Sequence, residues 1–264
     1  MVPVLSTRVF GRVPTGGDLA IARRLRLFDF ELWLDGFAPA EVRGLVPRLE
    51  ALGLRVPSVH LPVRGPAGLL DVDDPDRLFR QDALDLLRRA LDLTELFHPV
   101  AVVTHARGVA GDGLGRLLGE ADERGLRLAL ENDTLPGSSP DRLARVLGRM
   151  GSVAEGHGLC VDLSRAHVDP AGFAALDPHL LWVEVSSRAG DHAHGPPDGA
   201  DRALRESVEA CRLPYVAYEV VPSGPPEFPA GEAQVMVLLR RVVAWHLGAG
   251  QPMYQGASPF LPLG

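Results

Sequence analysis

Six side chains that could bind a divalent ion or move a proton follow a shared pattern in this sequence. Each stands at or near the end of a short apolar run with the pattern of a β-strand. Carboxylates and imidazoles are common ligands of divalent ions, and carboxylates also act as general acids and bases. The six residues are His60, His105, Glu131, Asp162, Glu184 and Glu219.

The elements that must position these residues alternate along the chain. Apolar runs indicate eight strands, at 5–10, 28–34, 56–61, 100–105, 126–132, 159–164, 181–187 and 215–221. The stretches between and after them indicate helices, at about 17–26, 39–52, 75–97, 113–124, 140–150, 170–176, 201–212 and 232–247. Eight such units are typical of a parallel barrel. We predict the α/β class and a single (β/α)8 TIM barrel over residues 1–250, with residues 251–264 as an extended tail packed on the barrel.

Side-chain alternation predicts which strand residues face the barrel axis. Neighbouring residues of a strand point to opposite faces. In the five strands where we compared both faces, the bulky apolar residues share one parity, which must lie under the helices, and the ionisable residue has the other. All six candidates count as inward, most of them near the carboxyl ends of their strands, where barrel enzymes have their active sites. Glu31 and Trp33 have the same inward parity.

Four carboxylates that point at one axis need a positive charge to offset their repulsion. Glu131, Asp162, Glu184 and Glu219 would repel one another in a poorly solvated site. A bound divalent ion is the simplest compensation, so the sequence predicts a metal site. For any single position, a buried and hydrogen-bonded carboxylate with a structural role is the alternative.

The ordered series of motifs resembles the xylose isomerase-like barrel superfamily, which includes sugar epimerases, hydroxypyruvate isomerase, inosose dehydratase and the apurinic endonucleases. The likeness covers nearly the whole chain. The segments that carry it are "SVHLP" with His60, "VVTHARG" with His105, "LALENDT" with Glu131, "GLCVDLSRAH" with Asp162 and "VAYEV" with Glu219.

The resemblance implies a divalent-metal-dependent isomerase or epimerase acting on a small carbohydrate or hydroxy-keto acid. In the enzymes it resembles, an ion binds adjacent substrate oxygens while two glutamates remove and return a proton. Applied to this chain, the resemblance implies a catalytic pair of Glu131 and Glu219. It also implies four metal ligands, which are Glu131, Asp162, Glu184 and Glu219. Oxygen ligands favour Mn²⁺ or Mg²⁺, with Zn²⁺ as the alternative.

Substrate binding is predicted for His60, His105, Arg165, His194 and Trp33. Arg165 stands where the superfamily usually has a histidine, and an arginine suits a carboxylate or phosphate. Glu184 also replaces a histidine, that of the seventh strand. These two departures count against a trinuclear zinc nuclease site. Packing of Trp33 on its neighbours is the alternative to an aromatic substrate platform.

The stretch "SSRAGDHAHGPPDG", at 186–199, contains Asp191, His192 and His194 after the seventh strand. Its place predicts a lid over the end of the barrel that supplies at most one outer contact, from His194. A solvated loop without a ligand role is the alternative.

Two other functions stay open at this point. A metal-dependent hydrolase or oxidase would use His60 and His105 for a second ion. A metal-free barrel would bind a small molecule or a partner without catalysis. The number of bound ions separates the three.

The composition of the chain narrows the classes of molecule that it is expected to bind. The formal net charge is −7, which disfavours a nucleic-acid-binding groove. The basic residues are all arginine, so lysine chemistry is excluded. The two separated cysteines and the lack of a signal or transmembrane segment predict a cytoplasmic protein with a small-molecule substrate and no membrane partner. The oligomeric state is open, with a homodimer as one option.

Overall fold

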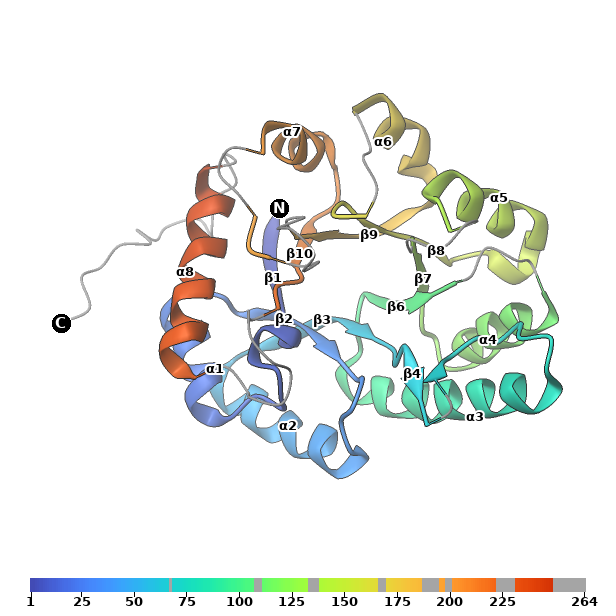
Figure 1. Ribbon diagram of the computed structural model, residues 1–264, viewed down its shortest axis with the longest axis horizontal. Coiled ribbons are helices and arrows are strands. Elements are labelled where there is room, and N and C mark those ends of the chain that lie inside the picture. The colour runs from blue at the N-terminus through green and yellow to red at the C-terminus, as the bar shows by residue number, and fades with distance from the viewer. Residues whose placement is uncertain are drawn as a thin grey trace.

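The computed structural model describes residues 1–66, 68–106, 111–132, 138–165, 170–186, 195–197, 201–221 and 231–248. Within these ranges, eight parallel strands close into a barrel and eight α-helices surround it (Figure 1). The predicted (β/α)8 barrel is therefore confirmed. The tail at 251–264 lies outside the described residues, so its packing stays a prediction.

The barrel strands pair in a closed ring. In ring order they are β1 (Val2–Ser6), β2 (Asp29–Trp33), β3 (Arg55–His60), β6 (Ala101–His105), β7 (Leu128–Glu131), β8 (Gly158–Asp162), β9 (Leu180–Val185) and β10 (Tyr215–Tyr218). The helices are α1 (Gly16–Arg24), α2 (Pro39–Leu52), α3 (Arg77–Thr94), α4 (Asp112–Glu123), α5 (Pro140–Met150), α6 (Pro170–Leu176), α7 (Arg202–Ala210) and α8 (Glu232–Gly248). Short 3-10 turns are η1 (Thr7–Phe10), η2 (Glu95–Phe97), η3 (Gly151–Ala154) and η4 (Asp177–His179).

The first strand lies earlier than the prediction of 5–10. After Ser6 the chain leaves the sheet and forms η1, in which the Thr7 hydroxyl accepts a hydrogen bond from the Trp33 backbone nitrogen at 2.9 Å. Val9 and Phe10 are fully buried in the helix-side core although they lie outside the strand. The apolar run therefore continues past the end of the strand, which is why hydrophobicity alone misplaces it.

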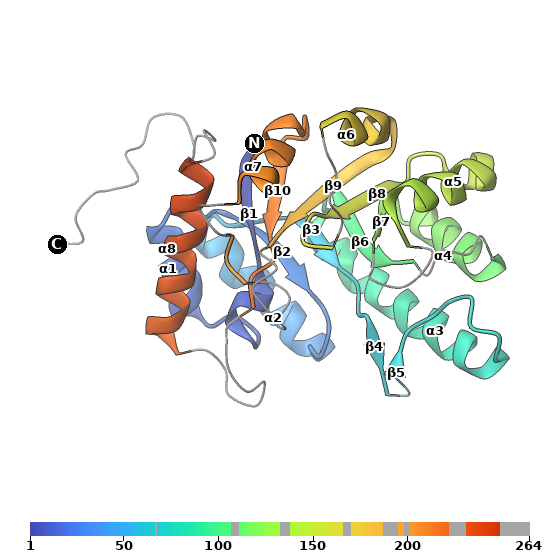
Figure 2. The ribbon, with the colours of Figure 1, turned by 45° about the horizontal axis from the view of Figure 1, so that its top comes forward.

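A small hairpin follows β3 and was not expected from the sequence. It pairs β4 (Arg64–Gly65) with β5 (Gly68–Leu69) in antiparallel fashion. Figure 2 shows it extending away from the barrel beside α3. Two-residue strands carry too short an alternation for a pattern to reveal them.

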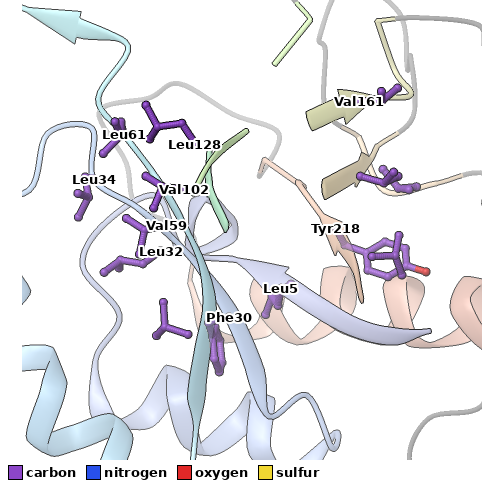
Figure 3. Packing of buried hydrophobic residues seen from close by; sticks show 14 of the residues in the cluster. Leu5, Phe30, Leu32, Leu34, Val59, Leu61, Val102, Leu128, Val161 and Tyr218 are labelled. Atoms are coloured by element: carbon purple, nitrogen blue, oxygen red, sulfur yellow. The ribbon is translucent and has the colours of Figure 1, made fainter. Parts of the chain in front are cut away.

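The two faces of the barrel strands carry different cores. The helix-facing residues form the large apolar cluster, part of which Figure 3 shows. A smaller cluster fills the inside of the barrel, and its members are Val4, Ala101, Val103, Ala129, Cys160, Trp182 and Ala217. Three of these lie two residues before a predicted ligand on the same strand, and Ala217 lies two residues before Glu219, just beyond β10, so the apolar cluster supports the carboxylates at the carboxyl end.

None of the helices in the described ranges has the length and apolar character that crossing a bilayer requires.

Candidate metal site at the carboxyl end of the barrel

Strand register places four of the predicted residues opposite one another in two pairs. His105 pairs with Glu131 between β6 and β7, and Asp162 pairs with Glu184 between β8 and β9. His60, Glu131, Asp162, Glu184 and Glu219 are all buried, although all but His60 are acidic. Their side chains face the axis because the alternate residues of their strands belong to the helix-side core.

Glu131 is the hub of the cluster. Its Oε2 atom lies 2.9 Å from His60 Nε2 and 2.8 Å from His105 Nε2, while its Oε1 atom lies 3.8 Å from Arg165 Nη1. Burial alone would raise the pKa of Glu131, but the His105 and His60 imidazoles outweigh burial and bring this pKa well below its ordinary value. Glu131 is therefore ionised at neutral pH.

His60 is held between two acceptors. Its Nδ1 atom lies 2.8 Å from the Leu61 carbonyl oxygen, so Nδ1 carries a hydrogen and donates it. Nε2 of the neutral ring then presents a lone pair to the Glu131 carboxylate. Burial lowers the pKa of His60 and favours this neutral ring. A cation bound by both His60 Nε2 and Glu131 Oε2 would balance this arrangement of a neutral ring beside an ionised carboxylate.

Asp162 is oriented by the turn that follows its strand. Its Oδ1 atom accepts hydrogen bonds from the Ser164 backbone nitrogen at 2.8 Å and the Ser164 hydroxyl at 2.7 Å. Its Oδ2 atom lies 2.9 Å from Arg165 Nε. On the neighbouring strand, the Asn132 amide donates to the Asp162 carbonyl oxygen at 3.1 Å and accepts from the Asp162 nitrogen at 2.8 Å. This reciprocal pair of hydrogen bonds joins the carboxyl end of β7 to that of β8.

Glu184 and Cys160 form a buried, hydrogen-bonded pair. The Cys160 thiol donates to Glu184 Oε1 at 3.3 Å. Burial, followed by the charges of Glu31 and Glu131, raises the pKa of Glu184 well above its ordinary value. Burial likewise raises the pKa of the Cys160 thiol. Without a cation, burial therefore favours the protonated form of Glu184.

Glu31 of β2 is a further buried carboxyl group in the barrel. Its Oε2 atom accepts from the Ser58 hydroxyl at 3.0 Å and from Trp182 Nε1 at 2.9 Å, the latter reaching from the far side of the barrel. Burial, with a contribution from the charge of Glu219, raises the pKa of Glu31 to about 8. Its inward parity is visible in the sequence, but that parity alone does not reveal its neighbours.

Glu219 lies just beyond β10 and forms an ion pair with Arg8 of η1. The Arg8 guanidinium carbon also lies 4.3 Å from the centre of the Trp33 ring, and the Trp33 and His60 ring centres are 3.6 Å apart. Trp33 is nearly buried and covered by Arg8 in this arrangement. Arg8 therefore covers one face of the predicted aromatic platform.

Two sets of atoms have the spacing of a metal site. One joins oxygens of Glu131, Asp162 and Glu184, the other joins His60, His105 and Glu131, and in each set the atoms lie within 4.8 Å of one another. Within the described part of the chain, Glu184 Oε2 is buried without a hydrogen-bond partner. An ion at the oxygen set would satisfy this atom and relieve the repulsion between the carboxylates. The donor chemistry therefore fits a divalent cation.

One predicted site residue lies outside the described ranges, and two residues that contact the site were not predicted. His194, together with Asp191 and His192, falls outside the described residues, so the lid stays a prediction. Arg8 and Asn132 have contacts in the site that sequence reasoning missed. Arg8 was hidden because its segment was expected to be a strand, and Asn132 because an amide carries no charge pattern.

Comparison with known proteins agrees with this geometry. The family model described as "Xylose isomerase-like TIM barrel" matches residues 25–201, a range that contains β2 to β9 but neither Arg8 nor Glu219. Sequence comparison with the curated proteins finds no match.

Solved structures share the fold at low sequence identity. A putative xylose isomerase from Rhodospirillum rubrum superposes with a TM-score of 0.71 at 17% identity, covering 93% of this chain and 98% of that one. The 3-keto-D-glucoside 4-epimerase from E. coli has a TM-score of 0.68 at 13% identity, with 94% and 99% coverage. A xylose isomerase domain protein from Alicyclobacillus acidocaldarius has a TM-score of 0.66 at 18% identity, with 95% and 99% coverage.

Proposed function

Since the chain belongs to the xylose isomerase-like TIM barrel family, we propose that it is a divalent-metal-dependent isomerase or epimerase acting on a small carbohydrate or hydroxy-keto acid. One observation carries the proposal: oxygens of the buried residues Glu131, Asp162 and Glu184 lie within 4.8 Å of one another. The 3-keto-D-glucoside 4-epimerase with the same fold is consistent with this class of reaction.

In this proposal, Glu131, Asp162, Glu184 and Glu219 hold the ion. Their all-oxygen donor set favours Mn²⁺ or Mg²⁺, with Zn²⁺ as the alternative. A bound divalent ion polarises substrate oxygens and so acidifies the neighbouring carbon-bound proton.

Glu131 and Glu219 exchange that proton with the substrate carbon. They come from β7 and from the end of β10, with β8 and β9 between them, so they approach a bound substrate from different directions. The low pKa of Glu131 keeps it ionised, as both a ligand and a base require. His60, His105, Arg165 and Trp33 are assigned to substrate binding, and His194 to an outer contact.

A second candidate function is favoured by the other donor set. His60, His105 and Glu131 would hold a second ion, and the His60 Nδ1 hydrogen bond to a backbone carbonyl is typical of a metal-bound histidine. Two ions suit a metal-dependent hydrolase or oxidase better than an isomerase.

Metal analysis of protein purified without chelator tests the proposal. We expect about one equivalent of divalent metal per chain in the wild type and a strong loss in Asp162→Asn, which removes a ligand charge. Arg55→Met is the matched control, because Arg55 pairs with Asp29 at the amino end of the barrel, 2.8 Å away. Two or more equivalents would favour the hydrolase or oxidase, and a metal-free wild type would favour a non-catalytic binding barrel.

A further inference from the structure

Two arginines border the buried carboxylates. Arg8 follows β1 and pairs with Glu219, and its side chain is 26% exposed against 1% for Glu219. Arg165 follows β8 and pairs with Asp162, with exposures of 15% and 0%. A molecule entering from solvent would therefore meet the guanidinium groups before it meets the carboxylates.

The arginines and the proposed ion share the same partners. Arg8 pairs with Oε1 of Glu219, and Arg165 pairs with Oδ2 of Asp162, both of which belong to proposed ligands. An ion bound to these carboxylates draws their charge away from the guanidinium groups and adds repulsion between cations. With an ion bound, the two partly exposed arginines consequently share their carboxylate partners with that ion.

Arg8 is also placed to select what reaches the aromatic surface. Its guanidinium carbon lies 4.3 Å from the centre of the Trp33 ring, so a substrate that stacks on this face of Trp33 must displace Arg8. Among the described residues, the one hydrogen-bond partner of the Arg8 side chain is Glu219. An arginine has five N–H donors in a planar fork, which matches carboxylate and phosphate oxygens in pairs.

We propose that Arg8 and Arg165 form an anion clamp, and that the substrate is a sugar derivative bearing an oxyanion group, either a carboxylate or a phosphate. The inference rests on the proposed function and deepens it, since an anionic group restores the charge pairing that the ion disturbs. Binding of the ion and of the anion is therefore mutually favourable, by the same factor in both directions.

Titration calorimetry with inorganic phosphate and with acetate tests the clamp, with the protein either stripped of metal or loaded with Mn²⁺. In the wild type we expect Mn²⁺ to tighten binding of at least one of these anions about ten-fold or more. A stronger response to phosphate would indicate a sugar phosphate, and a stronger response to acetate a sugar acid.

Substitution of the arginines separates the clamp from direct contact between anion and ion. Arg8→Met and Arg165→Met should still bind Mn²⁺ but lose most of this coupling, whereas the control Arg55→Met should keep it. Arg8→Lys retains the charge beside Glu219 and guards against misfolding; it should keep only part of the coupling, because an ammonium group lacks the planar fork.

These measurements distinguish failure of the anion clamp from failure of the proposed function. Full coupling in Arg8→Met and Arg165→Met, or Mn²⁺ binding without any anion coupling in the wild type, overturns the clamp and leaves the proposed function standing. Absence of Mn²⁺ binding in the wild type overturns the proposed function and the clamp together.

Discussion

Glu131 and Glu219 are assigned the proton transfer, and each can be tested by an isosteric change. Glu131→Gln and Glu219→Gln should each slow proton exchange at the substrate carbon by about two to four decades, because an amide cannot act as a base. Deuterium incorporation from heavy water, followed by NMR, measures the exchange, and circular dichroism checks the fold. Unchanged incorporation in either variant would remove that residue from the catalytic pair.

Glu31 should make the metal-free protein less stable as the pH rises. Its pKa is about 8 in the folded chain against an ordinary value of 4.5, so between these pH values the folded state holds a proton that the unfolded state lacks. The free energy of unfolding therefore falls as the pH increases through this window and levels off above it.

Urea unfolding from pH 5 to pH 9 measures this slope. Glu31→Gln should reduce the slope, because the amide is neutral at every pH and can still accept from Ser58 and Trp182. Glu155→Gln, at an exposed position, is the control and should leave the slope unchanged. An equal slope in Glu31→Gln and the wild type would show that Glu31 does not hold the proton.

At the scale of elements, the amino end of α4 depends on a close backbone approach. Asp73 accepts hydrogen bonds from the Gly113 nitrogen at 2.8 Å and the Leu114 nitrogen at 3.2 Å, capping the helix from a distant loop. A Cβ atom on Gly113 would lie 1.7 Å from the Val72 carbonyl oxygen. Only a glycine leaves space for this loop.

Gly113→Ala should therefore lower the free energy of unfolding by about 2 kcal/mol or more, through overpacking and loss of the cap. Gly119→Ala in the same helix is the matched control, because its Cβ would meet nothing within 4 Å. We expect that control to gain about 0.5–1 kcal/mol from helix propensity. Chemical denaturation of both variants measures the difference, and a loss in Gly119→Ala as large as that in Gly113→Ala would refute the steric account.

The hydrogen bonds that join the ends of β7 and β8 should affect the affinity of the site for the ion. Asn132 bonds both backbone groups of Asp162, so Asn132→Ala frees the strand end that carries a proposed ligand. We expect Mn²⁺ affinity to fall about ten-fold or more, as for other groups that orient metal ligands. Calorimetric titration measures it; affinity equal to that of the wild type would show that the strand end is held without Asn132.

At the scale of the whole molecule, ion binding should stabilise the fold in a pH-dependent manner. A ligand present at 100 times its Kd adds about 2.7 kcal/mol to the free energy of unfolding. Because burial raises the pKa of Glu184, a proton must leave before this carboxylate can bind an ion. Mn²⁺ should therefore raise the Tm more at pH 8 than at pH 6, and chelator should reverse the rise.

Differential scanning calorimetry measures these shifts. Asp162→Asn should show little response to Mn²⁺ at either pH, because it lacks one ligand charge. A larger rise at pH 6 than at pH 8 would mean that no proton leaves the site when the ion binds.

The sequence by itself determined the alternation of the strands and helices, and with it the inward side of residues such as Glu131 and Asp162. Both follow from local periodicity, because a strand places neighbouring side chains on opposite faces whatever its partners are. This local rule predicted the barrel and the end of it at which the carboxylates gather. It could not show where β1 ends, since Val9 and Phe10 stay apolar after the chain has left the sheet.

Only the tertiary structure decided which side chains meet across the barrel. Arg8 and Glu219 are 211 positions apart, and Glu31 and Trp182 are 151 apart. These pairs form because the ring of strands closes β10 against β1, which brings the segments around the first and last strands to one site. Whether the pKa of a buried carboxyl group is lowered, as at Glu131, or raised, as at Glu184, depends on neighbours from other strands, and no local pattern encodes them.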